Sequence, residues 1–229
     1  MAKRTFLELC QLAARKCGIE GSGPSAVTAQ TGILKKLVQW VAEADFETCS
    51  RYQDWDFMLV TDWAANTVIG TAAVSAPADI GNWDRQSFYL DYSAATHSWM
   101  TPMDYREWRD SLRQGVKTNQ RPSIVVFKPD GSLILEPPPD AVYSLTGEYQ
   151  AVATRLAADD DESRIPAMFE MVIVHRACMF YAADRGDPVK LANSETDFND
   201  LLSQMEAKHR PQQARRTDML ADDLVVRPE

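Results

Sequence analysis

Apolar side chains recur every three or four residues at the start of the chain, the spacing of one face of a helix. This pattern predicts a first helix over residues 5–17, with Thr5 and Glu8 at the spacing of a capping box and Gly18 at its end. It predicts a second helix over residues 31–52. Both helices carry one apolar stripe, so each is expected to pack against a shared core.

Two further helices are predicted near the end of the chain. Pro166 opens one that runs to about residue 184 and is apolar nearly all round, which indicates burial on more than one side. Gly186 and Pro188 separate it from a helix over residues 188–209. Residues 210–229 show no helical stripe and are expected to form an extended tail.

The middle of the chain changes to short runs rich in β-branched and aromatic residues, which are typical of strands. The clearest unit is a hairpin over residues 123–136, whose turn carries Pro129, Asp130 and Gly131. One short helix, from Met103 to Leu112, is predicted inside this region because Pro102 suits a first helical turn. The predicted strands are 57–60, 72–74, 88–92, 123–127, 133–135 and 142–149.

These elements predict an α+β fold with a helical core and a central antiparallel β insertion. Residues 1–56 and 156–209 would supply two helices each to the core, residues 57–155 would form the insertion, and residues 210–229 the tail. A chain of 229 residues with 45% hydrophobic residues can bury such a core.

The net charge and the composition of individual segments argue against several classes of protein. The net charge of −9 disfavours a general binder of nucleic acid or anionic membranes, because both need surplus positive charge. Glu170, His175 and Arg176 interrupt the longest apolar stretch, so no membrane span is expected. The first residues lack the apolar core and cleavage site of a signal peptide. Four cysteines without a CxxC pair are expected to be reduced core thiols.

Signatures of catalysis are weak. The sequence has no GxGxxG or Walker loop, no HExxH and no GxSxG. His175 and Cys178 share a helix face and could supply two zinc ligands or a nucleophile pair in a small hydrolase, but core packing is the favoured interpretation. No enzyme activity, metal or cofactor is therefore expected.

An acidic run occupies the loop before the third long helix. Four adjacent carboxylates favour a solvated loop or an acidic contact surface over a cation site, because the run lacks the spacing of a calcium loop. Its residues are Asp159, Asp160, Asp161 and Glu162.

Tryptophans close to arginines suggest an alternative function, a nucleic-acid-binding accessory module, since aromatic platforms beside cations bind single strands. Packing between helices and sheet is the competing interpretation of these aromatic residues. The patch consists of Trp99, Arg106, Trp108, Arg109 and Arg113.

The tail alternates apolar and charged residues, a pattern suited to binding along the surface of a partner. A flexible end is the alternative. The candidate contact residues are Arg215, Arg216, Met219, Leu220, Leu224, Val225 and Val226.

Turn and packing motifs from about residue 5 to 205 together resemble one family. The N-terminal half contributes 5–11, 17–19, 21–24, 30–32, 37–41 and 54–57, and the C-terminal half 129–133, 137–140 with Tyr143, 165–166 and 181–183. In combination the sequence resembles the head-to-tail adaptor, or connector, proteins of podovirus-like tailed bacteriophages.

The resemblance implies a structural protein rather than an enzyme. It implies a ring, commonly of twelve copies, that docks beneath the portal protein and receives tail or nozzle proteins. The tail segment would bind the portal, and double-stranded DNA would pass the channel without specific binding. Its place would be the head–tail junction of the virion, after assembly in the host cytoplasm. Whether the acidic run lines the channel is left open.

Overall fold

The computed structural model describes residues 2–93 and 96–210, and the chain folds into two compact units. The helical unit combines residues up to Phe57 with residues from Arg155 onward, and the β unit is Met58–Thr154. The β unit is thus inserted between the two halves of the helical unit. Within the described residues, no helix is both long and apolar enough to span a bilayer.

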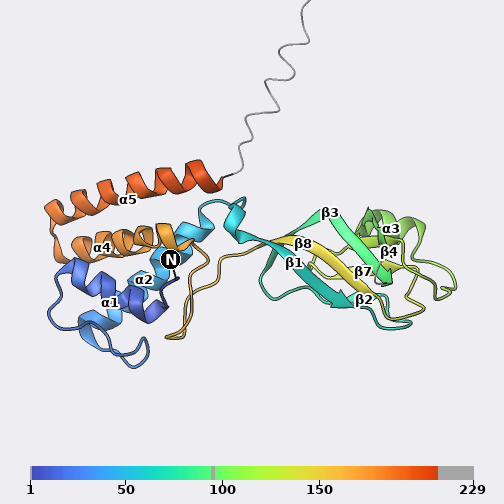
Figure 1. The fold of residues 1–229 in the computed structure, drawn as a ribbon, viewed down its shortest axis with the longest axis horizontal. Coiled ribbons are helices and arrows are strands. Elements are labelled where there is room, and N and C mark those ends of the chain that lie inside the picture. The colour runs from blue at the N-terminus through green and yellow to red at the C-terminus, as the bar shows by residue number, and fades with distance from the viewer. Residues whose placement is uncertain (1, 94–95, 211–229) are drawn as a thin grey trace, which may run out of the picture. The chain divides into compact units, whose positions relative to one another are not determined.

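In the helical unit, α4 occupies the central position. It lies between α5 on one side and α1 and α2 on the other (Figure 1), which explains why its sequence is apolar nearly all round. The four long helices were predicted within a few residues of their observed ends. The elements are α1 (Phe6–Cys17), α2 (Gly32–Ser50), η1 (Asp56–Met58), η2 (Ala167–Phe169), α4 (Met171–Arg185) and α5 (Pro188–His209).

The predicted start and end of α1 are confirmed. The Thr5 hydroxyl accepts from the Glu8 amide at 3.3 Å, and the Thr5 amide donates to Glu8 Oε2 at 3.0 Å. Gly18 ends the helix with φ of 73°, a conformation that glycine adopts without strain. These contacts satisfy backbone groups that the helix itself leaves free.

Two carboxyl groups are buried in the helical unit. Asp45 is 2% exposed, and its Oδ1 accepts a hydrogen bond from the Ser163 hydroxyl. Burial raises the pKa of Asp45 to about 6. Glu170 accepts from the Arg4 amide at 2.9 Å and pairs with the Arg4 guanidinium at 3.1 Å. Each carboxyl therefore joins parts of the chain that are more than a hundred residues apart.

The β unit contains two four-stranded sheets, with strand orders β1-β8-β3-β4 and β2-β7-β6-β5. One helix, α3 (Tyr105–Ser111), connects β5 to β6. The first sheet comprises β1 (Leu59–Asn66), β3 (Ile80–Ser93), β4 (Thr96–Trp99) and β8 (Ser144–Ala151); the second comprises β2 (Ala73–Val74), β5 (Thr101–Asp104), β6 (Ile124–Phe127) and β7 (Leu133–Glu136).

Aromatic rings fill the core of the β unit. Phe88 is fully buried and contacts Trp83 and Phe127 edge to face, with ring centroids 5.2 and 5.3 Å apart. Trp83 Nε1 also donates to the carbonyl of Gly131 at 2.7 Å. Because Trp83 and Phe88 lie on β3 and Phe127 on β6, these contacts join the two sheets.

The predicted α+β fold and the predicted hairpin over residues 123–136 are confirmed, but the prediction for one segment of the insertion was wrong. Residues 101–104, predicted to lead into or begin a helix, form strand β5, which pairs with β6 in parallel. The insertion is therefore mixed rather than antiparallel. Pro102 fits because β5 is an edge strand, where a missing amide hydrogen is tolerated. The helix begins at Tyr105 and provides the crossover that a parallel pair needs.

Candidate functional site

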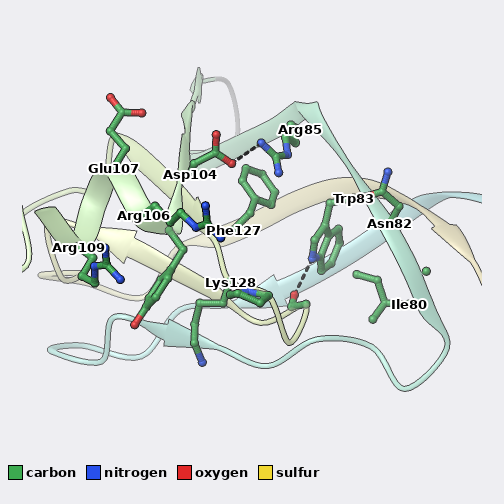
Figure 2. A pocket seen from close by; sticks show the side chains of 14 residues that line it. Ile80, Asn82, Trp83, Arg85, Asp104, Arg106, Glu107, Arg109, Phe127 and Lys128 are labelled. Carbon is green, nitrogen blue, oxygen red and sulfur yellow. Dashed lines mark hydrogen bonds and ion pairs between the residues drawn. The ribbon is translucent and has the colours of Figure 1, made fainter.

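A groove of about 820 Å³ opens on the β unit beside α3. Its walls come from the start of β3, the junction of β5 and α3, and the β6–β7 hairpin (Figure 2). The lining residues are Ile80, Gly81, Asn82, Trp83, Arg85, Asp104, Tyr105, Arg106, Glu107, Arg109, Phe127, Lys128, Pro129 and Gly131.

The cations of the groove are largely paired within the β unit. The Arg85 guanidinium lies 2.7 Å from the Asp104 carboxylate, and the Arg109 guanidinium lies 2.8 Å from that of Asp110. Lys128 Nζ lies 2.8 Å from the Asp130 carboxylate in the hairpin turn. Among the described residues, Arg106 makes no ion pair or hydrogen bond through its side chain. The lining itself carries four cations and two carboxylates, and three of the four cations are paired with carboxylates.

The residues of the tryptophan–arginine patch, the alternative interpretation of these aromatic residues, do not all line the groove. Arg106 and Arg109 line the groove. Trp108 instead donates from Nε1 to Glu136 Oε2 at 2.9 Å, so its indole is held by the β unit. Trp99 lies on β4, is 64% exposed and packs on Tyr89 with ring centroids 5.6 Å apart. Trp99 lies outside the groove lining, so the platform for stacked bases is divided.

The Arg113 amide donates to the carbonyl of Trp108 just after α3 ends, so this arginine belongs to the helix terminus rather than to the groove lining.

The acidic run has a structural role at its first and third positions. Asp159 Oδ1 accepts from the Val27 amide at 2.6 Å. Asp161 Oδ2 accepts from two backbone amides of its own loop, and these hydrogen bonds lower the pKa of Asp161. The backbone carbonyls of both residues accept from the first amides of α1. Asp160 and Glu162 are exposed and remain available for contacts.

His175 and Cys178 are both buried, but each has a different neighbour. His175 Nδ1 lies 3.4 Å from Asp197 Oδ2, and desolvation lowers the pKa of the imidazole. Cys178 Sγ lies 3.2 Å from the sulfur of Cys17. In the part of the chain that the structure describes, no group of three or more His, Cys, Asp or Glu side chains could hold a metal ion.

The tail residues Arg215, Arg216, Met219, Leu220, Leu224, Val225 and Val226 lie outside the described residues. The described chain ends just after α5, where the Arg210 amide donates to the carbonyl of Glu206 at 3.1 Å.

An apolar tip of the β unit was not found from the sequence. We define it as Val68, Ile69 and Val142, which are all about 60% exposed. Buried Thr67 holds the two loops together, because its amide donates to the carbonyl of Tyr143 at 2.9 Å and its hydroxyl accepts from the Tyr143 amide at 2.9 Å. The tip therefore consists of three exposed apolar side chains on two loops that backbone and side-chain hydrogen bonds join.

Comparison with known proteins identifies the family. A family model described as SU10 adaptor protein matches residues 4–223, which spans both units and most of the C-terminal segment. A search of curated proteins found no match. The chain therefore belongs to the SU10 adaptor protein family, whose name denotes phage adaptor proteins.

Proposed function

We propose that the protein is a head-to-tail adaptor that assembles into a ring, docks beneath the portal protein and receives the tail. The observation that carries this proposal is the family match over residues 4–223. The helical unit would form the ring body, and the number of copies expected from the sequence resemblance is twelve. The ring would lie at the head–tail junction of the virion.

Surfaces suited to protein contacts support this role. An adaptor needs several, and the apolar tip provides one at the end of the β unit where β1 ends and β8 begins. The chain enters and leaves the β unit at the opposite end of the same two strands, where Leu59 pairs with Gln150. The tip therefore lies at the end of the β1–β8 pair opposite to the two chain crossings, where it would bind a neighbouring protein.

Charge supports passage of DNA without capture. Each copy carries a net charge of −9, so a ring would be strongly acidic. DNA would be repelled rather than retained by such a channel. Asp160 and Glu162 are the exposed members of the acidic run. They would add to the negative charge of the ring whether they face the lumen or a neighbouring subunit.

The C-terminal segment would bind the portal. It begins directly after α5, and residues 212–229 can be removed without deleting any described element. Its apolar pairs, Met219 with Leu220 and Val225 with Val226, would supply the anchors, and Arg215 and Arg216 the charged contacts.

Electron microscopy of the protein mixed with its portal ring tests the proposal. The expected result is a second annulus stacked under the portal, absent when either protein is imaged alone. Portal particles that stay unchanged beside free monomers would contradict the adaptor role. A salt-dependent shift of labelled DNA would then favour the accessory nucleic-acid-binding module.

Two sets of variants separate the contact surfaces. Truncation after Pro211 should leave the helical circular dichroism unchanged but weaken portal binding; a truncated protein that docks equally well would remove the tail from the interface. Ile69→Asp should weaken assembly or tail binding without unfolding the β unit. Val116→Asp is the matched control, because Val116 is fully exposed in the same β unit but lies between α3 and β6, away from the tip in sequence.

A further inference from the structure

Two cysteines that are 161 residues apart in sequence meet inside the helical unit. Cys17 is the last residue of α1, and Cys178 lies in the middle of α4. Their sulfur atoms are 3.2 Å apart, and each residue is 1% exposed. A disulfide needs a separation of about 2.05 Å, so the sulfurs must approach by roughly 1 Å more.

The position of Cys17 permits this approach. It is followed by Gly18, which ends α1, so the backbone beyond the thiol is not held by further helical turns. The Cys17 carbonyl accepts from Lys190 Nζ at 2.8 Å, which places a cation near the pair. Cations near a thiol pair favour the thiolate, the reactive form in thiol–disulfide chemistry.

Either thiol of the pair can donate its hydrogen to the other sulfur across this contact. When one of the two thiols loses its proton, the other can therefore stabilise the thiolate by donating to it. The thiolate is the nucleophile, and the second sulfur is already placed to complete the bond.

The other two cysteines provide an internal comparison. Cys10 and Cys49 are also buried, at 0% and 4% exposure. Burial raises the pKa of Cys10 to about 12, and the Cys49 thiol donates to Asp45 Oδ1 at 4.0 Å rather than to another sulfur. Both thiols are thus expected to be inert under conditions that oxidise the pair.

We propose that Cys17 and Cys178 form a site of covalent modification, an intramolecular disulfide that joins α1 to α4 when the protein meets a two-electron oxidant such as hydrogen peroxide. One sulfur of the pair attacks a peroxide oxygen, the O–O bond breaks, and hydroxide leaves with the proton of that thiol as water. The other sulfur then attacks the sulfur of the resulting sulfenic acid, and the S–O bond breaks. The second hydroxide leaves with the proton of the second thiol, so two thiols and one peroxide give one disulfide and two waters.

Peptide mapping of the full-length native chain tests the site. After peroxide treatment, blocking of free thiols in denaturant and trypsin digestion without reductant, each cysteine lies on its own peptide. The expected product links peptides 17–35 and 177–185, with the loss of two hydrogen atoms. Peptides 5–15 and 37–51, which carry Cys10 and Cys49, should remain blocked as free thiols.

The cross-link should also raise the thermal midpoint of the helical unit by roughly 5 to 15 °C, because it closes a very long loop. Dithiothreitol should reverse the rise. Cys49→Ala is the matched control and should keep both the linked peptide and its reversible effect, whereas Cys17→Ala should lose them.

Peptide mapping uses the wild-type protein and needs no variant. It therefore tests whether the disulfide forms even if a cysteine substitution prevents folding. Absence of the linked peptide, equal oxidation of all four cysteines, or cross-links between chains would overturn the proposal.

Discussion

Replacing Asp45 by Asn should change how the stability of the helical unit depends on pH. The carboxyl lies on α2, is 2% exposed and accepts a hydrogen bond from Ser163. Asn keeps an oxygen that can accept this bond but has no charge to bury. The variant therefore isolates the cost of ionising a buried carboxyl group.

The size of the effect follows from the pKa. Burial raises the pKa of Asp45 from 3.8 to about 6, so the folded state holds a proton that the unfolded state releases. Stability must then fall as pH rises between these values. The shift corresponds to about 3 kcal/mol in total, of which about 2 kcal/mol is lost between pH 4.5 and 7.5.

Urea unfolding followed by circular dichroism at 222 nm measures this change, because the four long helices lie in the helical unit. Between pH 4.5 and 7.5, the free energy of unfolding of Asp45→Asn should rise by about 2 kcal/mol relative to that of the wild type. Asp160→Asn, at an exposed loop position, is the control and should run parallel to the wild type. A difference between Asp45→Asn and the wild type that stays constant with pH, or reverses, would refute the argument.

Substitutions at three further sites test a packing contact, a buried hydrogen bond and a helix cap. Gly147→Ala places a Cβ 2.7 Å from the buried Phe88 ring and should cost about 2 kcal/mol in urea unfolding; Phe88→Leu in the same chain should make the two costs less than additive. Glu170→Ala leaves the Arg4 amide without its acceptor and should cost about 2 kcal/mol, with Glu170→Gln closer to the wild type, by the same assay. Thr5→Ala removes the α1 cap and should lower stability by about 1 kcal/mol, whereas Thr5→Ser should retain it; equal losses would contradict the capping role.

Local patterns predicted the helices well because each has a stripe or a cap that its own residues define. The strands were harder. β3 runs from Ile80 to Ser93, but only residues 88–92 were predicted, because its first half carries charged and polar side chains such as Asp84 and Arg85 on an exposed surface. The parallel pairing of β5 with β6 depends on a partner about twenty residues away, which no local period reports.

Candidate contacts between distant residues could not be predicted for the same reason. Val68 and Val142 read as ordinary apolar residues, and only the folded loops bring them to one exposed tip. The four cysteines were expected to be core thiols, but their spacing could not indicate that Cys17 meets Cys178. The acidic run was expected to be solvated, yet the carboxylates of Asp159 and Asp161 bind backbone amides.

The insertion of the β unit has a consequence for the order of folding during synthesis. α1 and α2 cannot complete their core until α4 has been made, more than a hundred residues later. The β unit is continuous in sequence and closes on itself, since Leu59 pairs with Gln150. If it folds first, it brings the two ends of the helical unit together and shortens the loop that their association must close. The insertion would then assist the association of the helices, and substitutions that weaken the β1–β8 pairing should slow the folding of the helical unit.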